Sequence, residues 1–196
     1  MKKTLYKRFQ QYKDLGDKTF VQLTAEQLGW KYNEESNSIA TLVKHMHGNM
    51  KSRWTNFRTE DGEKSWRKRD EEFENDIKSK TEMLQLWEEG WEIFFKALDE
   101  IEEDNWQDLV QIGGQKLTVF DAVLRQLAHY SYHVGQIVYL GKMLSNEKWR
   151  NLSIEKNRQK VNTLEELKNQ NSTEIQENSS PVCYAKSDEV RDDYKI

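Results

Sequence analysis

The sequence predicts an all-α protein, a four-helix bundle with a small β-hairpin before its last helix. Two observations support this fold class. The chain has one proline and nine glycines among 196 residues, and 33% of its residues are charged, a composition that favours helices over short strands. In addition, four segments of roughly 20 residues place apolar side chains at helical spacing.

The first two long helices are predicted in the first third of the chain. One runs from about Thr4 to Leu23 and is followed by Thr24–Gln27, a capping-box sequence that predicts a short turn ending at Gly29. The next begins at Ser38, a favourable N-cap residue. Its apolar residues form one stripe: Ile39, Leu42, Val43, Met46, Met50, Trp54 and Phe57.

The last two long helices carry the heaviest apolar faces. The third spans about Ser79 to Ile101 and is rich in Trp and Phe. The fourth starts at Thr118, with Asp121 three residues later as a capping-box partner, and continues to about Ser145. Because its apolar residues cover well over half of its circumference, we expect this helix to be the central one.

The two connections around the third helix differ in kind. Leu109–Ile112 and Gln115–Thr118 flank Gly113-Gly114, which predicts a β-hairpin with a two-residue turn. The earlier connection, Arg58–Phe73, is long for a bundle, and long loops are often functional. A loop of mixed charge with one tryptophan could be a lid over the end of the bundle, but we favour the more common alternative, a solvated linker.

The composition changes near residue 150. Residues 1–150 are predicted to form the helical domain, whereas residues 151–196 are mostly polar and are predicted to form a tail that is disordered or loosely attached. The single cysteine, Cys183, lies in this tail with no histidine nearby in the sequence, so we do not assign it a catalytic role.

Charge and hydropathy exclude several classes of function. The net charge is −4, so no global basic field attracts nucleic acid. No apolar run is long enough to span a membrane, and no apolar segment follows the basic amino terminus as a signal peptide requires. A lone cysteine cannot form an internal disulfide, which suits a reducing compartment. We therefore expect a cytoplasmic protein.

His129 and His133 are the most informative pair of residues in the chain. One helical turn separates them, so both imidazoles leave the same face of the fourth helix and can reach one metal ion. The alternative is that both are ordinary surface or core residues, which chance alone produces more often. An open catalytic metal site commonly has three protein ligands, and the chain has two further histidines, His45 and His47.

The choice of a third histidine rests on the surroundings of each candidate. His45 and His47 lie about 200° apart around the helix axis, so only one can face the pair. His47 is nearer the apolar stripe, which predicts that it is the more buried. His45 shares its face with Thr41, Asn49 and Ser52. Because a metal pocket needs polar neighbours, we favour His45 and keep His47 as the alternative.

Several neighbours extend this candidate site. His133 has mostly apolar surroundings, which would depress its pKa and keep it neutral, as a metal ligand must be. Tyr132 and Gln136 flank it and could contact the metal ligands. Asn49 and Arg53 continue the face of the third histidine and could contact a polar or anionic substrate, although a surface salt bridge is the alternative role for Arg53.

These motifs resemble the DinB/YfiT-like superfamily over roughly residues 1–150. The resemblance is carried by Leu42-Val-Lys-His-Met46, the His129-x-x-x-His133 spacing and the following Gly135-Gln136. Gly48–Trp54 and Thr59–Lys64 look like an uncharacterised Bacillus-type branch of it. Many relatives have a further histidine directly before the last ligand, where this chain has Tyr132.

The resemblance implies a fold, a metal site and an activity. It implies a four-helix bundle in which His45, His129 and His133 hold a divalent metal ion, with Zn²⁺ or Ni²⁺ the leading candidates. It further implies an enzyme acting on a small molecule, foremost a transferase that uses a low-molecular-weight thiol of the bacillithiol type. The alternatives are a metal-dependent hydrolase and a non-enzymatic metal-binding bundle. The surplus of aromatic residues leaves enough for a homodimer interface.

Overall fold

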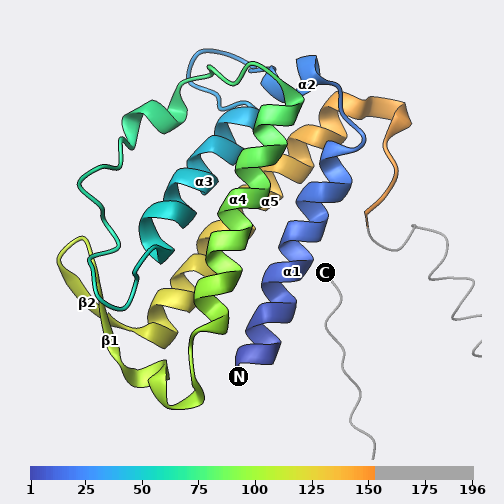
Figure 1. Cartoon of the computed structure of the whole chain (residues 1–196). Coiled ribbons are helices and arrows are strands. Elements are labelled where there is room, and N and C mark those ends of the chain that lie inside the picture. Colours follow the sequence, from blue (N-terminus) through green and yellow to red (C-terminus); the bar gives the residue numbers. More distant parts are fainter. Residues whose placement is uncertain (153–196) are drawn as a thin grey trace, which may run out of the picture. The chain divides into compact units, whose positions relative to one another are not determined.

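The computed structural model describes residues 1–152, which are mostly helical and include one small hairpin (Figure 1). The predicted tail and Cys183 lie almost entirely outside these residues. The described part has five α-helices: α1 Lys2–Phe20, α2 Ala25–Gly29, α3 Ile39–Trp54, α4 Lys80–Asp99 and α5 Val119–Ser145. None of these helices has the length and apolar character needed to cross a bilayer.

The caps explain where the helices begin. The side chains of Ser38, Ser79 and Thr118 each accept a hydrogen bond from a backbone amide in the first turn of α3, α4 and α5. Thr24 and Gln27 form the predicted capping box of α2. These starts are confirmed, whereas α1 ends at Phe20, three residues earlier than expected.

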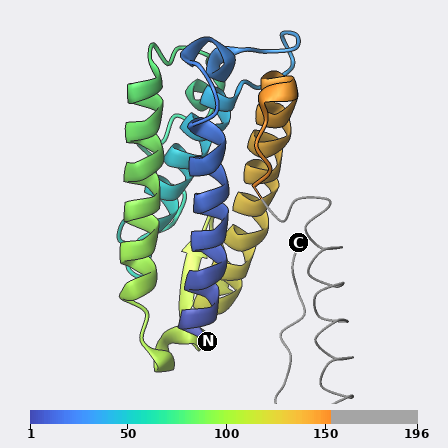
Figure 2. The ribbon, with the colours of Figure 1, turned by 90° about the vertical axis from the view of Figure 1, so that its right-hand side faces the viewer.

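The order of the long helices requires one long return of the chain. Following the colours in Figures 1 and 2, α3 and α4 run in the same direction, and α1 and α5 run in the opposite one. Parallel neighbours cannot be joined by a short turn. The connection, residues 55–79, therefore travels back alongside α3 to the end where α4 begins (Figure 1).

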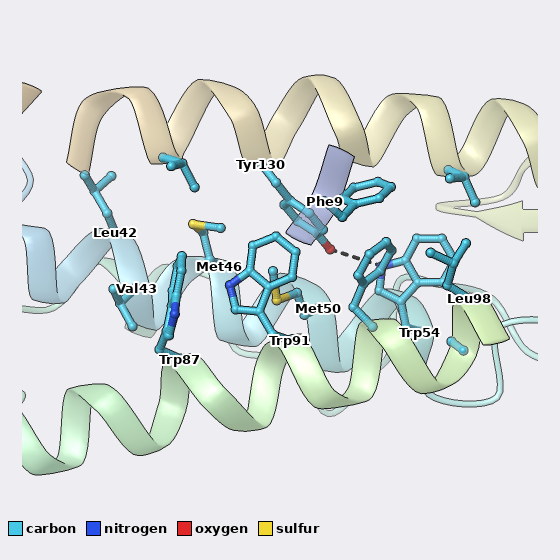
Figure 3. Packing of buried hydrophobic residues seen from close by; sticks show 14 of the residues in the cluster. Phe9, Leu42, Val43, Met46, Met50, Trp54, Trp87, Trp91, Leu98 and Tyr130 are labelled. Carbon is cyan, nitrogen blue, oxygen red and sulfur yellow. Dashed lines mark hydrogen bonds between the residues drawn. The ribbon is translucent and has the colours of Figure 1, made fainter. Parts of the chain in front are cut away.

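The core is rich in aromatic rings that interlock between α1, α3, α4 and α5 (Figure 3). The Phe9 and Phe94 ring centroids are 4.3 Å apart, and Trp54 meets Phe94 edge-on at 5.0 Å. Tyr130 of α5 is completely buried among them, and its hydroxyl accepts a 3.0 Å hydrogen bond from Trp54 Nε1 (Figure 3). Burial of these rings stabilises the fold through the hydrophobic effect and favourable ring contacts.

The expectation that the last helix is the central one is wrong. Eleven of the 16 residues of α3 are buried, against ten of the 27 residues of α5. α5 exposes Leu124, Tyr132, Tyr139 and Met143 to solvent. The difference arises because the connection covers a further side of α3, and the sequence pattern of α3 by itself does not reveal that cover.

The hairpin is formed as predicted. β1 Leu109–Ile112 pairs antiparallel with β2 Gln115–Thr118, with Leu109 opposite Thr118. Gly113 and Gly114 both have positive φ, 59° and 76°, which side chains disfavour and which a tight two-residue turn requires. The hairpin leads directly into α5 and so fixes where that helix begins.

The favoured interpretation of the connection as a solvated linker is wrong. Asp61 accepts hydrogen bonds from the backbone amides of Gly113 and Gly114 in the hairpin turn. At the other end, the Asn75 side chain bonds to Ser38 at the start of α3. The connection is thus fastened at both ends, although its tryptophan, Trp66, is 52% exposed. These contacts are hydrogen bonds between polar groups, and composition alone does not reveal which polar groups will pair.

Candidate metal centre

Three histidines from two helices meet beside the core. His45 lies on α3, and His129 and His133 lie one turn apart on α5. Each offers one nitrogen, and these atoms all lie within 4.8 Å of one another. His129 Nε2 is 3.4 Å from His45 Nε2 and 3.0 Å from His133 Nε2. His45 and His133 are buried, and His129 is partly exposed, so the cluster is open on its His129 side.

Hydrogen bonds on the far side of two rings determine which nitrogen faces the centre. His45 Nδ1 lies 3.0 Å from Glu72 Oε2, and His133 Nδ1 lies 3.0 Å from Gln136 Oε1. Both partners are oxygen acceptors, so each Nδ1 carries the proton and donates. The Nε2 atoms of these two rings therefore present lone pairs toward His129.

This arrangement fits a divalent ion. A proton on His129 Nε2 can form a good hydrogen bond to only one of the two lone pairs that face it, on His45 Nε2 and His133 Nε2. A cation at the centre instead interacts with the lone pairs of all three Nε2 atoms. Ligand nitrogens in a tetrahedral zinc site with bonds of about 2.0–2.1 Å lie roughly 3.3 Å apart, close to the two observed separations. Three histidines leave a coordination position for a substrate or water.

The electrostatics favour the neutral forms of His129 and His133. Burial, together with the charges of His133 and His45, lowers the pKa of His129 to about 3. Burial also lowers the pKa of His133, in the direction expected from its apolar surroundings. A neutral imidazole releases no proton when it binds a metal, so these two histidines are suited to metal binding at neutral pH.

His47 does not join the cluster. Its Nε2 lies 3.2 Å from Glu89 Oε2 of α4, without the alignment of a hydrogen bond. A Cβ atom at Gly90 would come within 3.3 Å of His47 Cα, so the two helices approach closely at this point. The expectation that His47 is the more buried of the two is wrong, because the connection covers His45 and α4 covers His47 only in part.

The other predicted site residues have mixed outcomes. Gln136 contacts His133 as expected, and the Tyr132 ring meets the His133 ring edge-on at 5.0 Å while remaining largely exposed. Asn49 accepts a 3.3 Å hydrogen bond from the Tyr130 hydroxyl inside the core. It therefore lies beside the site in a structural contact.

Arg53 is held between helix and connection. Its Nη2 forms a 3.0 Å ion pair with Glu63, which matches the salt-bridge alternative. That pair is not on the open surface, because the Arg53 side chain is only 11% exposed and its Nε and Nη1 atoms are buried without hydrogen bonds. Burial lowers the pKa of Arg53, and its positive charge contributes to the low pKa of His129.

Sequence reasoning missed the residues that the connection brings to the site. Glu72 lies in an acidic run, and Arg67 in a basic one, so both resemble solvated charges. The available signal was Gly48, since a glycine inside a helix costs about 0.5–1 kcal/mol relative to alanine and needs a reason. That reason is space, because a Cβ atom at Gly48 would overlap Glu72 Oε1.

A comparison with known protein families gives a match. A family described as a protein of unknown function (DUF1572) matches residues 2–158, which include all the described helices and the three histidines. No curated protein matches the chain.

Proposed function

The chain belongs to the DUF1572 family, and we propose that it is a metal-dependent enzyme that transfers a low-molecular-weight thiol to a second small molecule. In this proposal the described helices form a four-helix bundle of the DinB/YfiT type. His45, His129 and His133 hold a divalent ion, with Zn²⁺ or Ni²⁺ the best candidates for imidazole ligands.

The convergence of three imidazoles carries the proposal. The Nε2 atoms of the three rings face one another at 3.0 and 3.4 Å, and two of the rings are oriented by their own hydrogen bonds. A divalent ion held by neutral ligands keeps its full charge and strongly favours the ionised form of a thiol or water bound to it. The residues around the cluster would orient the three histidines and leave one side of the ion accessible.

The surroundings favour thiol transfer over hydrolysis. Hydrolysis usually needs a general base to activate water. Among residues 1–152, Glu72 is the carboxylate that contacts the cluster, and it already accepts hydrogen bonds from both His45 and Arg67. A thiol has a much lower pKa than water and needs less assistance to ionise. We therefore place thiol transfer first and hydrolysis second.

The proposed reaction is a substitution. The sulfur of the thiol forms a bond to an electrophilic carbon of the second substrate, and the leaving group departs from that carbon with its bonding electrons. The thiol proton is released to solvent or to the leaving group. A reducing cytoplasm maintains such thiols in the free state, and His129 marks the accessible side of the cluster.

Two measurements test the proposal in sequence. The first is metal content by mass spectrometry of protein purified without a histidine tag, for which we expect about one ion per chain, and much less for His129→Ala. The second is a screen for conjugation of small thiols to electrophiles, with and without a chelator. Absence of bound metal would overturn the proposal of a metal-dependent enzyme. Bound metal without any thiol conjugation would instead favour a hydrolytic or structural metal site.

A further inference from the structure

The connection between α3 and α4 delivers a carboxylate to the metal-ligand cluster. Glu72 Oε2 lies 3.0 Å from His45 Nδ1, and Glu72 is only 6% exposed. An ionised carboxylate can only accept hydrogen bonds, so His45 Nδ1 must donate. The contact therefore leaves the Nε2 lone pair of His45 facing His129.

Arg67, from the same connection, holds this carboxylate in place. Arg67 Nε donates to Glu72 Oε1 at 2.7 Å, and Arg67 Nη2 donates to Glu72 Oε2 at 2.8 Å. Such a two-point contact fixes both the position and the plane of the carboxylate. Although burial favours the neutral acid, the hydrogen bonds from Arg67 and His45 lower the pKa of Glu72.

Two further residues, Gly48 and Phe73, pack closely against the contact between His45 and Glu72. Gly48 lies three residues after His45 on α3, and any Cβ atom there would overlap the Glu72 carboxylate. Phe73, the next residue along the connection, stacks on the His45 ring with centroids 4.7 Å apart and an angle of 28°. The His45 ring is thus fixed by a hydrogen bond at its edge and by an aromatic ring on its face.

The partners of the two buried histidines differ in charge and origin. His133 donates to Gln136, a neutral amide on its own helix. His45 donates to a charged carboxylate from outside the helices. A carboxylate partner raises the basicity of the imidazole more than an amide does and strengthens its bond to a metal.

We propose that Glu72 is a positioning residue for His45 and that the 55–79 connection is part of the metal site. This inference rests on the proposed metal binding. Glu72 selects the Nδ1–H form of His45, directs Nε2 toward the other two histidines and strengthens it as a ligand. Loss of the carboxylate charge should therefore weaken metal binding while the helices stay folded.

The test measures the Zn²⁺ dissociation constant of the full chain by competition with a chromophoric chelator. Glu72→Gln keeps the size of the side chain and removes its charge, and Glu72→Ala removes the contact. Loss of such a partner typically weakens metal affinity by about 10–100-fold, and we expect the alanine variant at the weaker-binding end. The matched control is Glu71→Gln, an exposed neighbour paired with Lys68 at 2.9 Å, which should bind as the wild type does.

A second measurement separates positioning from a merely structural role. In metal-free protein with ¹⁵N-labelled histidine, NMR should show the Nδ1–H form of His45 in the wild type and a mixture of forms in Glu72→Gln or Glu72→Ala. Wild-type affinity and an unchanged proton position in both Glu72 variants would overturn the inference alone. Failure of the wild type to bind Zn²⁺ would instead overturn the proposed function. If Glu72→Ala does not fold, Glu72→Gln decides.

Discussion

His45 and His47 are two residues apart on α3, and each lies close to a carboxylate. Glu72 is 3.0 Å from His45, and Glu89 is 3.2 Å from His47. Their other neighbours are entirely different. His45 faces two further imidazoles, whereas His47 is in the close contact between α3 and α4.

Proximity to a carboxylate therefore does not distinguish the histidine inside the cluster from the histidine outside it. The face of α3 toward α5 and the connection keeps polar groups buried, namely Thr41, His45, Asn49 and Ser52. The face toward α4 packs Val43, Met50 and Trp54 against aromatic rings. One side of the helix thus carries the histidine of the cluster, and the other side packs into the hydrophobic core.

The largest expected effect separates the two histidines by metal binding. His45→Ala should remove one of three ligands and weaken Zn²⁺ affinity by more than the ~10–100-fold typical of losing a residue that only orients a ligand. His47→Ala should leave the affinity unchanged. Isothermal titration of both variants measures this, with melting temperatures as the control for folding. Equal losses of affinity would remove the distinction between the two faces.

The next effect concerns stability and should appear on the opposite face. Phe94 of α4 is fully buried, with its ring centroid 4.3 Å from Phe9 and 5.6 Å from Tyr130. Phe94→Ala should lower the free energy of unfolding by about 3–5 kcal/mol, because it leaves a cavity among rigid rings. Urea denaturation measures the loss. A destabilisation well below 1 kcal/mol would mean that this face does not carry the stability.

Two helical glycines give a smaller, matched contrast. Gly48→Ala should destabilise the protein by about 1–3 kcal/mol through overpacking, because its Cβ atom meets the Glu72 carboxylate that Arg67 holds in place. Gly135→Ala, on α5 with nothing within 4 Å of its Cβ position, should stabilise by about 0.5–1 kcal/mol. Thermal unfolding with and without Zn²⁺ compares them, and only Gly48→Ala should weaken metal binding.

Local signals predicted most of the fold. The starts of α3, α4 and α5 were predicted from their N-cap residues, Ser38, Ser79 and Thr118. The hairpin turn was predicted from Gly113-Gly114. Each of these signals depends on contacts within a few residues, which sequence spacing reveals. The spacing of His129 and His133 is of the same kind.

Features that depend on the path of the connection were mostly not predictable, because Gly48 signals only that some group packs closely against α3. Glu72 and Arg67 look like surface charges until the chain returns along α3 and buries them together. The same return makes His45 the more buried histidine, against the expectation from the apolar stripe of α3. Pairing between distant polar residues leaves no periodic pattern in the sequence, so only the three-dimensional path identifies it.

The smallest expected effect tests whether the face of α3 that carries His45 depends on the hydrogen bonds by which Asp61 fastens the connection to the hairpin turn. The backbone amides of Glu63, Gly114 and Gly113 lower the pKa of Asp61. A carboxyl whose pKa is lower in the folded chain contributes stability above its unfolded pKa of about 3.9, and this contribution is lost as the pH falls through the folded pKa. The stability difference between wild type and Asp61→Asn should therefore be present at pH 7 and shrink at acidic pH.

Urea denaturation of both chains at a series of pH values measures that difference, in which the contributions of all shared groups cancel. Amide hydrogen exchange at Gly113 and Gly114 provides a local readout, because both amides donate to Asp61 and should exchange faster in Asp61→Asn. A difference that grew toward low pH would have the wrong sign for an ionised anchor. Zn²⁺ affinity should fall only slightly in the variant, because Asp61 acts on His45 only through the connection. Amide hydrogen exchange around His47 should not change.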